Sequence, residues 1–160
     1  MELLQHYAKD PEMMFRFFVF NGNRKIGDLE LTQKAIDAVK IYTANYELVD
    51  YSSNVRDTWN SIAACDCIFS VRLHAGIFAH FANRPFILVE YHKKSTDFLD
   101  EIGYAENRRL GDMNLSLEES INRTNYVLNN YAEMKLADRA LLTKKAMLSF
   151  THEKIVKQYV

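Results

Sequence analysis

The chain has 160 residues, of which 48% are apolar, which suffices for one compact domain with a sizeable core and is short for two. Twenty basic and twenty-one acidic side chains give a formal net charge of −1, so no global positive field favours nucleic acid or an anionic membrane as a partner. The apolar runs are too short for a transmembrane span, and the first residues lack the features of a secretory signal. We therefore expect a cytoplasmic protein that binds any anion at a local site.

The cysteines and three of the histidines show no pattern of a disulfide framework or a metal site. Cys65 and Cys67 are the only cysteines, and His6, His80 and His152 have no ligand partners at metal-site spacing. The sequence therefore predicts reduced, structural thiols, ordinary core or surface histidines, and neither a metal nor a cofactor.

The first two thirds of the chain alternate short apolar runs with amphipathic stretches. In chain order we predict a helix over 2–9, a buried central strand over 14–20, a helix over 29–42 that Asp28 caps, a strand over 46–49, a helix over 55–64, a buried strand over 67–70, a helix over 73–82 and a buried strand over 86–89. This alternation is typical of parallel βαβ units, with crossovers on both faces of the sheet. A turn at Asn21-Gly22-Asn23 ends the first strand.

The last third is predicted to be helical. A helix over 94–102 ends at Gly103, and further helices follow over 117–134 and 136–158. The predicted fold is one Rossmann-like three-layer α/β domain over 1–160 with a small parallel sheet, its α/β core at 1–112 and a helical segment at 113–160. An apolar stripe on the last helix either packs on the domain's own sheet or drives dimerisation; it contains Leu136, Ala140, Leu141 and Met147.

Polar side chains follow two successive strands at the point where each strand ends. The first junction, Ser70 to Gly76, carries Arg72 and His74, and the second, Glu90 to Ser95, carries two lysines. In an open parallel sheet such junctions meet at one edge, beside helix N-termini with unpaired N–H groups. A guanidinium, a point positive charge from Lys93 or Lys94, and an imidazole would suit an anionic substrate and proton transfer. Ordinary helix capping and solvated lysines are the structural alternative.

The residues at both junctions resemble the signature of polysaccharide pyruvyltransferases. In that family an acid precedes a strand ending in Arg-Leu-His, an alanine-rich helix follows, and a proline-led strand ends in Tyr-x-x-Lys. The corresponding residues here are the segment 65–79, then Pro85-Phe86, Tyr91, Lys94, Asp97-Phe98 and Gly103.

The resemblance implies transfer of the enolpyruvyl skeleton of phosphoenolpyruvate, the donor substrate, to a saccharide acceptor, with formation of a pyruvate ketal and release of phosphate. It implies a glycosyltransferase B architecture in which this chain is the carboxy-terminal catalytic half. His74 would be the proton donor, while Arg72 and Lys94 would hold the donor's carboxylate and phosphate. Further substrate contacts would come from Ser70, Leu73, Tyr91 and Lys93. Leu73 either packs inward or offers its backbone N–H, and Tyr91 is either a packed aromatic or a binding residue.

Two features depart from the family pattern. Glu90 would repel an anionic donor unless it points away, binds the sugar or pairs with Lys93, and His92 and Lys93 also replace the residues usual at their positions. The amino-terminal Rossmann domain of the family is not expected in this chain, so such a domain, or a second copy in a homo-oligomer, would complete the cleft.

Two other functions fit the same fold. One is half of a nucleotide-sugar glycosyltransferase or epimerase, which requires a pocket for the base and a Glu on the ribose. The other is a non-catalytic remnant that binds glycan or a partner subunit through the same surface.

Overall fold

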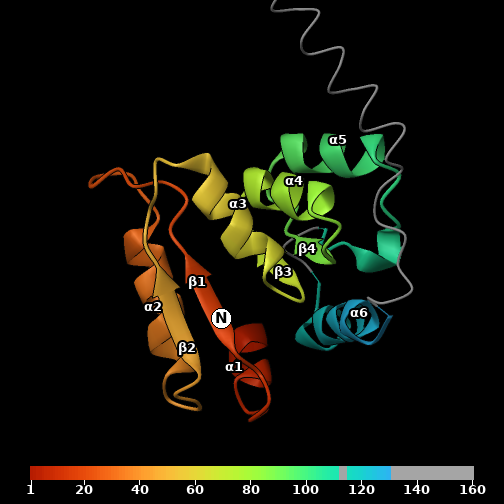
Figure 1. Ribbon diagram of the computed structural model, residues 1–160. Helices are drawn as coiled ribbons and strands as arrows, with labels where there is room; N and C mark the ends of the chain where they lie inside the picture. Colours follow the sequence, from red (N-terminus) through yellow and green to blue (C-terminus); the bar gives the residue numbers. More distant parts are fainter. Residues whose placement is uncertain (112–114, 131–160) are drawn as a thin grey trace, which may run out of the picture.

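Helices and strands alternate along the chain in the order that the sequence predicts (Figure 1). The computed structural model describes residues 1–111 and 115–130. The helices of this part are α1 (Glu2–Tyr7), α2 (Leu29–Val39), α3 (Val55–Ala63), α4 (Leu73–Phe81), α5 (Lys93–Glu101), the 3₁₀ helix η1 (Glu106–Arg108) and α6 (Leu117–Asn130). The strands are β1 (Phe15–Phe18), β2 (Tyr46–Val49), β3 (Ile68–Ser70) and β4 (Phe86–Leu88). The helix predicted over 136–158 and its apolar stripe lie outside the described residues.

Local chemistry sets several of these boundaries. The side-chain oxygen of Asn54 accepts the N–H of Arg56 at 3.1 Å and so caps the start of α3. Gly103 follows α5 with a φ of 64°, a left-handed conformation in which glycine carries no steric penalty. The predicted end of this helix at Gly103 is confirmed.

The strands form two separate pairs, which corrects the prediction of a single small sheet. β1 pairs with β2 in parallel, from Phe15 opposite Tyr46 onward, and β3 pairs with β4 in parallel, from Ile68 opposite Phe86 onward. No backbone ladder joins β1 to β3 in the part of the chain that is described. Aromatic side chains after and within β1 instead pack against the core cluster around β3 and β4.

The core lies around β4. Phe86, Ile87 and Leu88 are all buried, as predicted for this strand, and the buried side chains of Leu99 in α5 and Val127 in α6 belong to the same cluster. Burial of the other two predicted core strands is only partial. β1 leaves Arg16 exposed, where it pairs with Glu47 across the strands, and β3 leaves Phe69 41% exposed.

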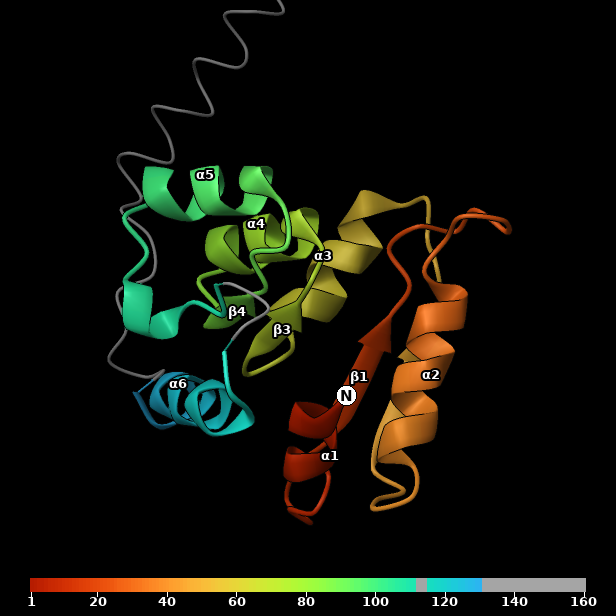
Figure 2. The ribbon, with the colours of Figure 1, turned by 180° about the vertical axis from the view of Figure 1, so that it is seen from behind.

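The helices surround this core on both sides (Figures 1 and 2). α3, α4 and α5 lie on one side of β3 and β4, and α6 lies on the other, in contact with η1, α1 and β4. The hydroxyl of Tyr7 donates to Asn125 Oδ1 at 2.7 Å and so ties α1 to α6. None of the helices in the described ranges is long and apolar enough to cross a membrane.

The chain leaves β1 and β3 in different directions. The crossover through α2 leads to β2 on one side, and the crossover through α4 leads to β4 on the other. In open α/β sheets, ligands bind where the crossovers diverge in this way, outside the carboxyl ends of the strands. The loops after β1 and β3 meet at this point, and they position the candidate site.

Candidate functional site

The turn between β3 and α4 is held by the hydroxyl of Ser70. This hydroxyl accepts the backbone N–H of Arg72 at 2.8 Å and donates to the backbone carbonyl of Arg72 at 3.1 Å. Arg72 is extended, with φ −96° and ψ 121°, and α4 begins at the next residue. Both hydrogen bonds of Ser70 stay within the turn, so this residue fixes the position from which Arg72 projects. Its contact with substrate stays a prediction.

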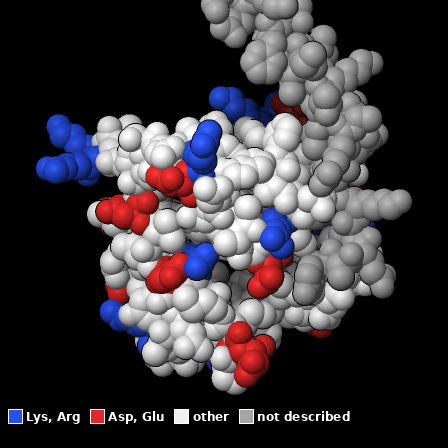
Figure 3. All heavy atoms as spheres, viewed as in Figure 1, with Lys and Arg blue, Asp and Glu red and all other residues white. Residues whose placement is uncertain are grey.

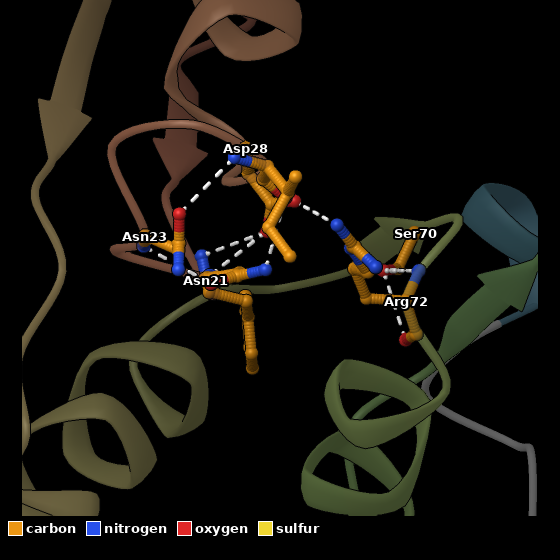
Figure 4. A network of polar contacts seen from close by, with 7 residues as sticks. Asn21, Asn23, Asp28, Ser70 and Arg72 are labelled. Carbon is orange, nitrogen blue, oxygen red and sulfur yellow. Dashed lines mark hydrogen bonds and ion pairs between the residues drawn. The ribbon is translucent and has the colours of Figure 1, made fainter.

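The Arg72 guanidinium reaches across to the loop after β1. Its Nη2 donates to Oδ1 of Asp28 in an ion pair between residues 44 positions apart (Figure 4). The Asp28 side chain is 9% exposed, and that of Arg72 is 42% exposed. The pKa of Arg72 is raised, mainly because Asp28 accepts this hydrogen bond, and to a smaller extent because Tyr91 lies close, whereas burial acts in the opposite direction.

Asp28 does not have the capping role that the sequence predicts. It occupies the position before α2, but its side chain makes no cap hydrogen bond to that helix. Its Oδ2 accepts the N–H groups of Phe20 at 3.2 Å and Asn21 at 2.9 Å. The carboxylate therefore points back toward the end of β1, where it faces Arg72.

The loop that carries Asp28 is tightly built. Asn21 Oδ1 accepts the N–H of Asn23 at 3.0 Å, and Asn23 Oδ1 accepts those of Lys25 at 2.8 Å and Ile26 at 3.1 Å. A Cβ at Gly27 would lie 2.1 Å from the Asn23 carbonyl oxygen and 2.4 Å from that of Asn21, so only glycine fits there. The turn predicted after the first strand is thus present, and it fixes the carboxylate.

The first turn of α4 presents Leu73 and His74 differently. The Leu73 side chain is partly buried against the core, whereas His74 is exposed. Within the described residues, the backbone N–H groups of Leu73 and His74 have no hydrogen-bond acceptor, because the first bonds of the helix run from Ala75 and Gly76 to the carbonyl of Arg72. Inward packing of Leu73 and an available N–H are therefore compatible. The start of α4 offers two unpaired donors beside Arg72 and His74.

The second junction lies next to the first. The N–H of Val89 donates to the carbonyl of Ser70 at 2.9 Å, which continues the pairing of β3 and β4 up to the turns. Tyr91, Lys93 and Lys94 follow, and all three are exposed; Tyr91 is 54% exposed and is therefore not a packed core aromatic. The adjacency of the two polar junctions, which was inferred from the sequence, is confirmed.

Helix α5 is capped by a residue that the sequence interpretation left without a role. Nδ1 of His92 accepts the N–H of Lys94 at 3.2 Å and so caps the start of α5. The helix begins at Lys93, one residue earlier than predicted, so that His92 occupies the cap position.

Cations stand at the start of α4 and α5, where acids are favoured. Helices α1, α2, α3 and α6 each have an acidic residue in the first turn, whereas α4 and α5 have none. These two helices begin instead with Arg72 and His74, and with Lys93 and Lys94. The positive end of a helix dipole disfavours cations, and a bound anion would relieve that conflict at both helices. Over the face shown in Figure 3, basic and acidic side chains are interspersed, so the attraction for an anion is local.

Glu90 points away from this group of cations. Its side chain is only 8% exposed, and its Oε2 lies 3.9 Å from Nη1 of Arg109. A Cβ at Gly111 would lie 3.1 Å from the Glu90 Oε1, which shows how closely the backbone passes the carboxylate. Of the three arrangements considered for Glu90, the structure adopts the one in which it points away, and its partner is Arg109.

The family of the chain follows from comparison with known proteins. The sequence model of the polysaccharide pyruvyl transferase family matches residues 2–93, which is more than half of the chain. The chain belongs to this family. No curated protein and no solved structure matches it. The matched range of this pyruvyl transferase family member contains both loops of the Asp28–Arg72 pair, the start of α4 and the first residue of α5.

The candidate site is thus made of donors and cations. Arg72 and the unpaired N–H groups of α4 suit the oxygens of a carboxylate or phosphate, and the two lysines add positive charge. His74 supplies a group that can transfer a proton near neutral pH. In the described part of the chain, no three His, Cys, Asp or Glu side chains come together as a metal site.

Proposed function

We propose that this chain catalyses pyruvyl transfer from phosphoenolpyruvate to hydroxyl groups of a saccharide. The proposal is supported by membership of the polysaccharide pyruvyl transferase family. It rests above all on one structural observation: two neighbouring helices begin with cations and have no acid in the first turn, and α4 also presents unpaired N–H groups. A donor with both a carboxylate and a phosphate has two anionic groups for these two helix starts.

The chemistry assigns a role to each group. His74 protonates the methylene carbon of phosphoenolpyruvate, and the adjacent carbon becomes electron-deficient. One saccharide hydroxyl attacks that carbon, phosphate leaves with its bonding electron pair, and a second hydroxyl closes the ketal, with loss of both hydroxyl protons. Arg72 and Lys94 hold the carboxylate and the phosphate, and they stabilise the charge that develops as phosphate leaves. Leu73, Tyr91 and Lys93 contribute further substrate contacts.

We also propose that the candidate site is one wall of a cleft between two Rossmann-like domains, as in a glycosyltransferase B fold, with this chain as the carboxy-terminal half. The exposure of His74, Lys93 and Lys94 supports this proposal, because groups that act in a water-excluded site need a second surface to cover them. A preceding domain or a second copy of the chain would supply that surface and the contacts to the acceptor.

The test is phosphate release from phosphoenolpyruvate by the full-length gene product, with a panel of disaccharides as acceptors. We expect His74→Ala to lower kcat by roughly 10²- to 10⁴-fold, the usual contribution of a positioned proton donor. His6→Ala is the matched control, since His6 is an exposed histidine of α1, and it should retain full activity. Unchanged turnover in His74→Ala would remove this residue from the mechanism. A thermal shift with nucleotide sugars and none with phosphoenolpyruvate would instead favour a glycosyltransferase.

A further inference from the structure

We propose that Asp28 is a positioning residue that holds Arg72 for the anionic donor. The inference rests on the proposed function, because Arg72 is the group that would bind the donor's anionic oxygens. Asp28 lies in the loop after β1, outside the motif of β3 and α4, and its role comes from the structure alone.

The contacts of Asp28 exclude a direct part in proton transfer. Oδ2 accepts the backbone N–H groups of Phe20 and Asn21, and Oδ1 accepts Nη2 of Arg72. The side chain is 9% exposed, so little of it is accessible to a substrate. A carboxylate with both oxygens engaged and so little open surface is not available as a general base. The role left for the Asp28 carboxylate is therefore to bind and orient Arg72.

The contact leaves most of the guanidinium available. Arginine presents five N–H donors in a rigid planar fork, and Asp28 takes one of them. The Arg72 side chain remains 42% exposed, and Tyr91 is a second side chain close enough to hydrogen-bond with its guanidinium. A guanidinium that is held by Asp28 at one edge loses less conformational entropy when an anion binds at its other edge. Bidentate binding of the anion also depends on the orientation of the guanidinium plane.

The loop around Asp28 is rigid enough for this purpose. Its asparagine turns and the tight fit at Gly27 hold the carboxylate from the β1 side, while the Ser70 turn holds the Arg72 backbone from the β3 side. The pair therefore joins two turns that the backbone has already fixed, in a part of the molecule where no ladder connects β1 and β3. Precise placement of a binding group requires such a supporting set of contacts.

The first experiment compares wild type with Asp28→Asn in the full-length protein. Asparagine keeps an oxygen for the N–H groups of Phe20 and Asn21, but it removes the charge and turns an NH₂ group toward Arg72. We expect the KM for phosphoenolpyruvate and the Kd for inorganic phosphate to rise roughly ten- to a hundredfold, with a smaller change in kcat. Asp37→Asn is the matched control on the exposed face of α2, and it should change neither constant.

A double-mutant cycle separates positioning from a purely structural role. If Asp28 acts through Arg72, the effect of Asp28→Asn on the Kd for inorganic phosphate should disappear when Arg72→Gln is already present. Additive effects of the two substitutions would show that Asp28 only supports the loop, and they would overturn the proposal. If the Asp28→Asn variant does not fold, NMR of the Arg72 guanidinium in the wild-type protein provides the test. Restricted rotation of this guanidinium supports the pairing with Asp28, and free rotation overturns the proposal.

The same experiment distinguishes failure of the proposed function from failure of this inference. A wild-type protein that binds inorganic phosphate with the predicted coupling but transfers no pyruvyl group would refute pyruvyl transfer and support the role of Asp28. A wild-type protein that transfers the pyruvyl group, with additive substitutions in the cycle, would support the function and overturn the role of Asp28.

Discussion

Replacing Lys94 with glutamine should stabilise the protein while it weakens the anion site. Lys94 stands in the first turn of α5, near Lys93 and next to the start of α4 with its own cations. A charge at an exposed helix end contributes about 0.3–1 kcal/mol at low ionic strength, and the sign is unfavourable for a cation at the N-terminus. The backbone N–H of Lys94 keeps its bond to His92, so the cap survives the substitution.

The expected gain follows from that interaction. Lys94→Gln should raise the free energy of unfolding by about 0.3–1 kcal/mol at low ionic strength, or roughly 1–4 °C in Tm for a chain of this size. Lys94→Glu should raise it further, because the acid interacts favourably with the same helix end. Both gains should shrink at 0.15 M salt, where the Debye length is about 8 Å. Thermal unfolding followed by circular dichroism at 10 mM and 150 mM salt measures these differences.

The added stability should be accompanied by a loss of anion binding. Inorganic phosphate should raise the Tm of wild type and should raise that of Lys94→Gln less, since a ligand that binds the folded state more tightly stabilises it more at a given concentration. Lys25→Gln is the matched control, because Lys25 is an exposed loop lysine outside any helix, and it should change neither Tm nor the phosphate shift. A Tm for Lys94→Gln equal to or below that of wild type at low salt would refute the electrostatic conflict at α5.

Two further predictions concern the core around β3 and β4. Burial raises the pKa of Cys67 to about 12, so the folded state favours the neutral thiol. The neutral thiol stabilises the fold fully below the usual thiol pKa of about 8.5, and this stabilisation is lost as pH rises toward 12. Cys67→Ala should therefore show a shallower fall in the free energy of unfolding between pH 9 and 12 than wild type, and parallel curves would contradict the assigned burial effect. The hydroxyl of buried Tyr104 donates to the carbonyl of Phe86, so Tyr104→Phe should lower the free energy of unfolding in urea by about 1–3 kcal/mol, the cost of an unsatisfied buried carbonyl. Tyr126→Phe, at a half-exposed ring in α6, should change it little, and an equal loss in both variants would show that the Phe86 carbonyl is not the cause.

Local patterns along the chain were enough to predict most helices and strands and the turn that carries Arg72 and His74. Helix periodicity and short apolar strands predicted α2 to α5 and β1 to β4 to within a few residues, because these patterns reflect local backbone preference and burial of one face. The Arg72-Leu73-His74 turn was found because polar residues at the carboxyl end of a buried strand are a local signal. The parallel pairing of successive strands placed Lys93 and Lys94 beside it.

Which side chains face one another could not be predicted from these local patterns. Arg72 meets Asp28 across 44 residues, and Glu90 turns to Arg109, away from the anion site. The sequence suggested a helix cap for Asp28 and left the direction of Glu90 open, since the choice of partner depends on how the loops after β1, β3 and β4 come together in space. The two strand pairs are a further case: no ladder joins β1 to β3 in the described part of the chain, and periodicity along one strand carries no information about which strands lie close enough to pair.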